Sequence, residues 1–277
     1  MAITAFGDKS LDLSRPQIMG ILNVTPDSFS DGGSFSNLDD ALFQTQKMLS
    51  EGASIIDVGG ESTRPGALPV SLSEELDRVI PVVHAIKSRF DVVISLDTSS
   101  SAVMIDGAAN GAGLINDVRA LTRPDALEAA VSTGLPVCLM HMQGSPQTMQ
   151  ADPDYSEVYN EVLSFLLERA ALCQGLGLKS SQIFLDPGIG FGKTLEHNLE
   201  LLNNIDQIAN HGFEVLIGAS RKSMVGQVLN ADVQDRLYGT LGAHAAAYSK
   251  GASIFRVHDV KAHYDMLELM YRIKREK

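Results

Sequence analysis

Short runs of apolar and β-branched residues alternate along the chain with longer segments in which apolar residues recur every three or four positions. The short runs predict buried strands, and the longer segments predict amphipathic helices. About eight strands are predicted, over residues 17–22, 55–58, 92–96, 114–115, 136–140, 183–185, 215–217 and 254–257. Helices are predicted over residues 38–50, 74–89, 102–110, 125–132, 157–174, 195–210, 236–249 and 261–275. Ser71 and Glu74 form a capping-box pattern at the start of the second helix.

Strands that read as continuous apolar runs, each followed by a helix, are typical of an all-parallel sheet covered on both faces. About eight such units predict an α/β fold, a single (β/α)₈ TIM barrel that spans residues 1–277 as one domain. An open doubly wound sheet is the alternative, but the first strand–helix turn lacks the glycine pattern of a dinucleotide site. The segments after the first and second strands, 23–37 and 59–70, are long and rich in Gly, Pro and Ser. We expect them to be active-site loops.

Composition narrows the range of functions. Hydrophobic residues make up 44% of the chain and charged residues 20%, which is enough apolar material for a sizeable core. The net charge of −12 provides no basic footprint for nucleic acid, so we expect no such partner. No apolar run approaches the ~20 residues that cross a bilayer, and residues 1–13 do not resemble a signal peptide. These features predict a cytoplasmic protein with no membrane partner.

The two cysteines, Cys138 and Cys173, occur in unrelated contexts. A disulfide scaffold and a multi-cysteine zinc site would both require more cysteines than the chain contains. Cys138 lies in an apolar run, so we expect it to pack in the core.

Polar side chains follow nearly every predicted strand. They are Asn23, Asp57, Asp97, Asn116, Asp117, His141, Asp186, Ser220, Arg221, Lys222, Arg256, His258 and Asp259. Any one of them could cap a helix or hold a turn. His141 could be a ligand or a base, but a strand-end histidine with satisfied hydrogen bonds is the favoured interpretation. A ring of such residues at the carboxyl ends of barrel strands nevertheless favours a catalytic or binding site.

This ring divides into two chemical groups. Donors and positive charge suited to an anion such as a phosphate come from Asn23, Thr63, Arg64, Arg256 and His258. Mixed donors and acceptors suited to a flat heterocycle with amino and oxo groups come from Asp97, Asn116, Asp186 and Lys222. A solvated cation after a strand is the alternative interpretation of Lys222.

Several familiar motifs are absent. The segment 188–194 ends like a P-loop, but Pro187 occupies the position of the first glycine. Lys193 occupies the third glycine position of a dinucleotide fingerprint, and 218–222 lacks the closing glycine of a nucleophile elbow. No carboxylate cage or paired-histidine motif marks a dedicated metal site. This pattern is compatible with Mg²⁺ held mainly by the phosphates of a ligand.

Six phrases carry a family resemblance: MGILNVTPDSFSDGG at 19–33, IDVGGESTRPG at 56–66, LMHMQG at 139–144, LDPGIGFGK at 185–193, GASRKS at 218–223 and FRVHDV at 255–260. From about residue 11 to the C-terminus the chain resembles the bacterial dihydropteroate synthases, which are pterin-binding TIM barrels. The resemblance implies a folate-biosynthesis transferase that joins 7,8-dihydropterin-6-ylmethyl diphosphate to 4-aminobenzoate and releases pyrophosphate. It also implies Mg²⁺, a homodimer formed through late helices, and a sulfonamide target.

The resemblance further assigns roles to residues that match the family's motifs. Pterin would be held by Asp97, Asn116, Asp186 and Lys222, with Met140 and Arg256 flanking its ring. Asn23 would bind Mg²⁺, and the diphosphate would contact Asn23, Thr63, Arg64, Arg256 and His258. Aminobenzoate would be bordered by Pro65, Phe191, Ser220 and Lys222. The catalytic set would be Asp97, Asp186, Lys222, Arg256 and His258.

Two alternative functions remain at this point. A cobalamin-dependent methyltransferase would hold a pterin in a similar barrel, but it has no need of Thr63 and Arg64 together with Arg256 and His258. A catalytically inactive pterin-binding barrel is expected to have lost a charged residue at a strand end, and none is missing from this chain.

Overall fold

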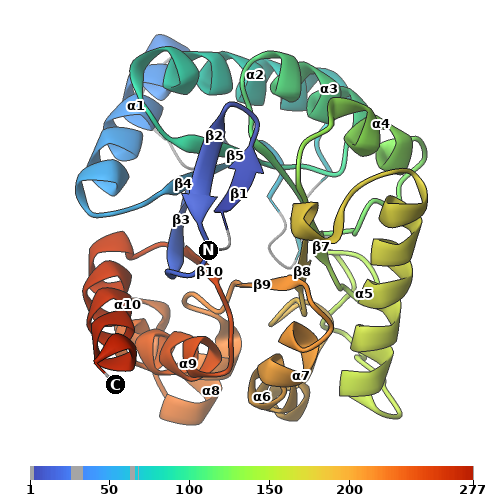
Figure 1. Cartoon of the computed structure of the whole chain (residues 1–277), viewed down its shortest axis with the longest axis vertical. Helices are drawn as coiled ribbons and strands as arrows, with labels where there is room; N and C mark the ends of the chain where they lie inside the picture. Colours follow the sequence, from blue (N-terminus) through green and yellow to red (C-terminus); the bar gives the residue numbers. More distant parts are fainter. Residues whose placement is uncertain (1–2, 26–33, 63–65, 68, 277) are drawn as a thin grey trace.

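The computed structural model describes residues 3–25, 34–62, 66–67 and 69–276. Within these residues, parallel strands close into a barrel in the order β10-β3-β4-β5-β6-β7-β8-β9, and helices surround it (Figure 1). The strands are β3 (Gln17–Asn23), β4 (Ile55–Gly59), β5 (Val93–Asp97), β6 (Leu114–Asp117), β7 (Val137–Met140), β8 (Ile183–Asp186), β9 (Glu214–Ile217) and β10 (Ile254–Val257). The predicted (β/α)₈ fold is confirmed, whereas the assignment of all 277 residues to one domain stays a prediction.

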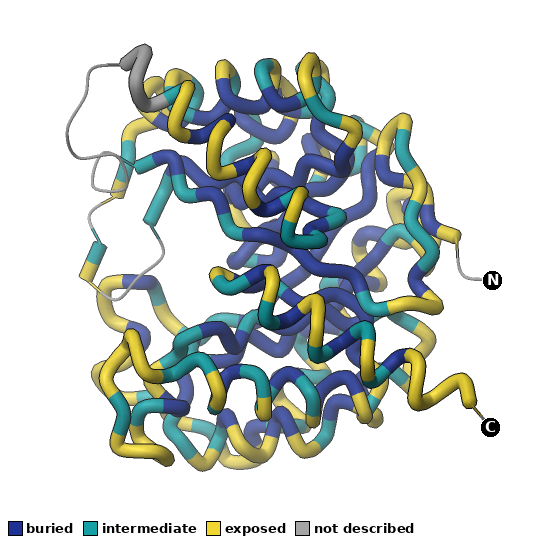
Figure 2. The backbone as a smooth tube through the Cα atoms, turned by 90° about the vertical axis from the view of Figure 1, so that its left-hand side faces the viewer, coloured by how far each residue is buried: buried dark blue, intermediate teal, exposed yellow. Residues whose placement is uncertain are grey.

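Helices form the outer layer of the molecule. They are α1 (Ser34–Ser50), α2 (Leu72–Arg89), α3 (Ser101–Ala109), α4 (Ala126–Thr133), α5 (Val158–Gly175), α6 (Leu195–Asn203), α7 (Ile205–Ala209), α8 (Ser223–Leu229), α9 (Leu237–Ser249) and α10 (Val260–Arg275). The short 3₁₀ helices η2 (Ser180–Gln182) and η3 (Val233–Asp235) lie between them. Figure 2 shows buried strands inside and exposed residues on the outward sides of the helices. None of the described helices is both long and apolar enough to cross a bilayer.

Local sequence signals explain several element boundaries. The capping box predicted at the start of α2 is confirmed: the Ser71 side chain accepts from the Glu74 N–H, and the Glu74 side chain accepts from the Ser71 N–H. The single helix predicted over 195–210 is wrong, because the chain breaks into α6 and α7 at Asn204. There the Asn204 side-chain amide donates to the Glu200 carbonyl at 2.8 Å and competes with the helical hydrogen bond.

An N-terminal hairpin that the hydrophobic pattern did not predict packs on one end of the barrel. It consists of antiparallel β1 (Ile3–Phe6) and β2 (Lys9–Asp12), and it lies across the ring of strands in Figure 1. The Phe6 ring stacks on Phe184 with centroids 5.6 Å apart. Phe6 belongs to a buried cluster that takes one side chain from each barrel strand, namely Met19, Ile55, Val93, Leu114, Cys138, Phe184, Leu216 and Ile254. The expected packing role of Cys138 is confirmed.

This apolar cluster has a functional consequence. It fills the barrel interior at the end where the strands begin. Polar side chains inside the barrel therefore gather at the other end, at the carboxyl ends of the strands. The loops predicted after β3 and β4, 23–37 and 59–70, begin at that end. Parts of both loops lie outside the described residues.

Candidate active site

The register of the sheet aligns several predicted site residues. Asn23 on β3 pairs with Gly59 on β4, Gly59 pairs with Asp97 on β5, and Asp97 pairs with Asn116 on β6. A Cβ atom at Gly59 would lie 3.3 Å from the Asp97 Cβ, so the glycine leaves room for the Asp97 side chain. Across the barrel Asp186 on β8 ends its strand in the same way. These residues therefore share the carboxyl-terminal rim, as the sequence predicts.

Asp57 is the centre of a buried hydrogen-bond network on this rim. Its side chain is fully buried and accepts from Ser95 Oγ at 2.5 Å and from Asn116 Nδ2 at 3.2 and 3.3 Å. Arg256 Nε donates to Asp57 Oδ2 at 2.6 Å, and Arg256 Nη2 donates to Asp97 Oδ2 at 2.6 Å. One guanidinium thus joins β10 to β4 and β5. The sequence indicated Asp57 as a strand-end polar residue but assigned it no role.

The charges in this network do not balance. Burial disfavours the Arg256 charge, but Asp57 and Asp97 raise the pKa of Arg256 above its ordinary value, so the side chain stays a cation. Burial raises the pKa of the Asp97 carboxyl to about 7; Arg256 opposes this shift and Asp57 adds to it. Two carboxyl groups therefore share one cation. This excess of carboxyl groups favours positive charge on a bound ligand.

Asp186 and Lys222 form the opposite side of the site. Asp186 is buried and its Oδ1 accepts from the Gly188 N–H at 2.7 Å; burial nevertheless raises its carboxyl pKa to about 6. Burial, followed by the nearby Arg256 charge, lowers the pKa of Lys222 to about 8. Lys222 Nζ lies 3.9 Å from the centroid of the Phe191 ring, in a cation–π contact. These groups supply both a donor and an acceptor whose pKa values lie close to neutral pH.

An apolar patch adjoins these polar groups. Met140, which pairs with Asp186 in the sheet, clusters with Val118, Met149 and Phe191, and all four side chains are buried. An apolar surface beside groups that form directional hydrogen bonds is typical of a pocket for a flat heterocycle. Met140 and Phe191 are thus placed near each other, as their predicted roles on the pterin and aminobenzoate sides require.

The turn after β9 brings two further predicted residues together. The His258 N–H donates to Ser220 Oγ at 3.2 Å, and His258 Nδ1 lies 2.9 Å from the same oxygen. Between Ser220 and Lys222 the backbone adopts the left-handed conformation, with φ +56° at Arg221. This conformation is held by a hydrogen bond from the Arg221 N–H to Thr240 Oγ1 and by guanidinium bonds of 2.5 and 2.9 Å to Asp259. His258 itself is exposed.

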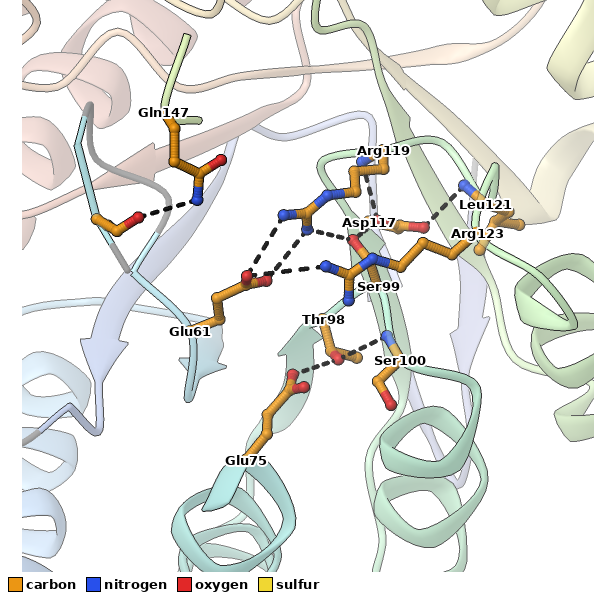
Figure 3. A network of polar contacts seen from close by, with 11 residues as sticks. Glu61, Glu75, Thr98, Ser99, Ser100, Asp117, Arg119, Leu121, Arg123 and Gln147 are labelled. Atoms are coloured by element: carbon orange, nitrogen blue, oxygen red, sulfur yellow. Dashed lines mark hydrogen bonds and ion pairs between the residues drawn. The ribbon is translucent and has the colours of Figure 1, made fainter. Parts of the chain in front are cut away.

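A second polar network borders the rim where the β4 and β6 loops meet (Figure 3). Arg119 Nη1 and Nη2 donate to the Glu61 carboxylate at 3.1 and 3.4 Å, and Arg123 lies 3.8 Å from it. Arg119 also donates to Ser99 Oγ at 2.9 Å, and the Ser99 hydroxyl donates to Asp117. Neither Glu61 nor Arg119 has a role that the sequence motifs predict. Their places just after β4 and β6 were the sequence signal that could have indicated a site role for these two residues. Their pairing could not be predicted, because it joins two loops that lie 58 positions apart in the chain.

Three predicted site residues, Thr63, Arg64 and Pro65, lie outside the described residues. Glu61 is described and anchors the chain just before them. The structure thus brings the predicted pterin-reading residues to one rim and leaves the roles assigned to Thr63, Arg64 and Pro65 as predictions.

Residues 19–258 match the model of a family described as pterin binding enzyme. A dihydropteroate synthase of Haemophilus influenzae is 55% identical over 262 residues, which cover 95% of this chain and 95% of that protein. The chain belongs to the dihydropteroate synthases. Members of this family are transferases. The high identity to these relatives confirms the family resemblance that the motifs indicated.

Solved structures of dihydropteroate synthases have the same fold. The Yersinia pestis dihydropteroate synthase, solved as a sulfonamide drug complex, has a TM-score of 0.93 and 51% identity; the match covers 99% of this chain and 100% of that one. The Xanthomonas albilineans dihydropteroate synthase, solved with 4-aminobenzoic acid, has a TM-score of 0.94 and 40% identity, with 100% and 99% coverage.

The Arg256 network predicts a pH-dependent loss of stability. Arg256→Met removes the shared cation and leaves Asp57 and Asp97 facing each other, so we expect the free energy of unfolding at pH 8 to fall by about 3–5 kcal/mol. Because Arg256 lowers the pKa of Asp97, the folded state without Arg256 holds the Asp97 proton more tightly than the unsubstituted folded state does. The loss should therefore shrink as the pH falls toward 5.

Urea unfolding at pH 5, 6 and 8 measures this dependence. Arg272→Met is the matched control, because the Arg272 pair with Glu268 is exposed and its removal should change stability very little. A loss for Arg256→Met that is constant across these pH values would contradict the shared-cation interpretation.

Proposed function

We propose that this chain joins 7,8-dihydropterin-6-ylmethyl diphosphate to 4-aminobenzoate, forming 7,8-dihydropteroate and pyrophosphate. The proposal rests on the buried pair of carboxyl groups around Arg256. Asp57 and Asp97 share this one cation, so carboxyl groups outnumber the cation at this part of the barrel rim. The family supports the choice of substrates, since a relative was solved with 4-aminobenzoic acid.

Pterin recognition rests on the mixed donors and acceptors of the rim. Asp186 and Asp97 accept from the amino and ring N–H groups of the pterin, while Asn116 and Lys222 provide donors to its oxo and ring nitrogen acceptors. The ring lies between Met140 and the plane of Arg256. Burial of these groups is the energetic basis of selectivity, because a ligand without matching polar atoms would leave them unpaired.

The reaction breaks the bond between the pterin methylene carbon and the diphosphate oxygen, and the electron pair leaves with the diphosphate. The resulting cation is delocalised over the pterin ring. The aminobenzoate nitrogen then attacks the methylene carbon and loses a proton. Asp97 and Asp186, as fixed carboxylates, stabilise the cation as it develops. No protein nucleophile is required.

The leaving diphosphate is placed near Asn23, Arg256 and His258, with Thr63 and Arg64 completing the anion site. The oxygen of the Asn23 side chain suits Mg²⁺, and the rim carboxylates Asp57 and Asp97 are already paired with Arg256. This donor set fits a Mg²⁺ ion that is held mainly by diphosphate oxygens together with Asn23. When bound, Mg²⁺ neutralises charge on the leaving group.

Aminobenzoate occupies the side of the rim bordered by Phe191, Lys222 and Ser220, with Pro65 as a further wall. The Phe191 ring provides an apolar surface for the benzene ring. Lys222 and the Ser220 hydroxyl offer donors for its carboxylate.

The proposal includes assembly and location. We propose a homodimer through late helices, because apolar side chains on α8, η3 and α9 are more than half exposed, namely Val228, Leu229, Val233 and Tyr238. Gly242 offers a close-packing point on α9, where a Cβ atom would meet nothing within 4 Å. A monomeric mass at micromolar concentration would contradict this part. A cytoplasmic location, with no nucleic-acid or membrane partner, remains the expectation from the sequence.

The Asp186 assignment predicts a specific loss of pterin binding. Asp186→Asn keeps an acceptor for the Gly188 N–H but removes the charge, so we expect the pterin affinity at pH 8 to fall by about 1.5–3 kcal/mol. In the unsubstituted protein, affinity should fall as the pH drops below about 6, because the Asp186 pKa of about 6 marks protonation of the acceptor. Asp186→Asn should lose this part of the pH dependence.

Calorimetry with a pterin lacking the diphosphate measures both effects. Asp265→Asn is the control, since Asp265 lies exposed on α10 and pairs only with Lys261 among the described contacts. Unchanged pterin affinity in Asp186→Asn would contradict its role.

The activity itself is tested by mixing the purified protein with Mg²⁺, the dihydropterin diphosphate and 4-aminobenzoate. We expect pyrophosphate and dihydropteroate in equal amounts, and neither product when EDTA is added or when aminobenzoate is omitted. Pterin binding without product would contradict the proposal and favour the methyltransferase or inactive-barrel alternative.

A further inference from the structure

Lys193 is a buried lysine that the proposed mechanism does not use, and its burial lowers its pKa to about 7. Lys193 is only 3% exposed and follows the glycine-rich segment after β8, most of which is buried as well. Lys193 Nζ lies 3.0 Å from His141 Nδ1, 3.2 Å from the His141 carbonyl oxygen and 3.0 Å from the Phe191 carbonyl oxygen. The three donors of the ammonium group thus match three acceptors, two from the residue after β7 and one from the loop after β8.

The two loops that Lys193 joins are in direct backbone contact. At Gly188, where φ is +70°, a Cβ atom would lie 1.9 Å from the His141 carbonyl oxygen. At Gly192, where φ is +64°, it would lie 2.5 Å from the Gln143 carbonyl oxygen. Only glycine permits this approach at either position. The Tyr155 hydroxyl adds a hydrogen bond of 2.8 Å to the Gly192 carbonyl, which ties the loop to a further segment.

His141 serves as a constant acceptor for Lys193. Burial, together with the Lys193 charge, lowers the pKa of His141 to about 3, so the imidazole is neutral at physiological pH. The neutral ring directs the lone pair of Nδ1 toward Lys193 and packs edge-on against Phe165, with centroids 5.0 Å apart. The satisfied-histidine interpretation of His141 agrees with these contacts, and its partner is the lysine.

Phe191 connects this contact to the reaction site. Its carbonyl oxygen accepts from Lys193, whereas its ring faces Lys222 Nζ at 3.9 Å and packs in the cluster that contains Met140. A shift of the Phe191 backbone would therefore move the ring on the aminobenzoate side. Lys193 contacts the Phe191 carbonyl, and its ammonium is fully occupied by acceptors in the protein.

We propose that Lys193 is a positioning residue for aminobenzoate: by holding the Phe191 carbonyl against the His141 backbone and imidazole, it sets the Phe191 ring at the aminobenzoate side. The inference rests on the proposed function, which places aminobenzoate against Phe191. It implies that Lys193 affects one substrate much more than the other, which a general contribution to folding does not.

Steady-state kinetics with Lys193→Met tests the inference, because methionine keeps the apolar length of the side chain and removes the three donors. We expect the KM for 4-aminobenzoate to rise about tenfold. The KM for the pterin diphosphate and the calorimetric affinity for pterin should stay within about twofold. Lys179→Met is the control, since Lys179 is exposed before η2, and it should change neither KM.

A double-mutant cycle separates positioning from folding. Because Lys193 acts through Phe191, Lys193→Met should raise the aminobenzoate KM far less in a Phe191→Leu background than in the unsubstituted protein. Independent multiplication of the two effects would overturn the inference. His141→Phe is a second variant, which keeps both carbonyl acceptors and a flat ring. It should raise the same KM by a smaller factor, and an unchanged KM would count against the proposal.

The same assay distinguishes a failure of the proposed function from a failure of the proposed role of Lys193. If the unsubstituted protein forms no dihydropteroate, the proposed function fails. If it forms product and Lys193→Met leaves the aminobenzoate KM unchanged or raises both KM values equally, the proposed function stands and the positioning role of Lys193 is overturned.

Discussion

The ion pairs of Arg256 are the interaction on which both the closed barrel and the site depend. Arg256 lies 199 positions from Asp57 and 159 from Asp97 along the chain, yet one guanidinium binds both at 2.6 Å. The last strand is thereby tied to β4 and β5, across β3, with which it closes the barrel. The network can form only when the barrel is closed, so the chemistry of the rim is a direct product of the topology.

The unfavourable burial of these carboxyl groups is also what suits the rim to its proposed chemistry. Burying two carboxyl groups around one cation, and a third carboxyl opposite, raises the pKa of Asp97 to about 7 and that of Asp186 to about 6. These shifts mean that ionised carboxylates are unfavourable in the empty folded protein. A ligand that supplies N–H donors or develops positive charge relieves this penalty, which is why such a rim suits a reaction that passes through a pterin cation.

Much of the fold and part of the site could be predicted from the sequence. The strand–helix alternation predicted the barrel, because strands buried on both faces give continuous apolar runs. The β1–β2 hairpin escaped prediction because its four-residue strands carry no sustained pattern, and the break at Asn204 depends on one side-chain hydrogen bond. Strand ends indicated which polar residues meet, but not their partners. The contacts of Asp57 with Arg256 and of Lys193 with His141 join distant segments and follow only from the closed structure.

Proton release on pterin binding tests most directly whether the carboxyl groups of the rim ionise when the ligand binds. The ligand in question supplies N–H donors and forms a cation during the reaction. Calorimetry at pH 6.5 in buffers of different ionisation enthalpy measures the proton release. We expect the binding of a neutral pterin to release protons, because Asp97 and Asp186 must ionise to accept its N–H groups. This proton release should decline by pH 8.5. Proton uptake, or no proton exchange at pH 6.5, would contradict this expectation.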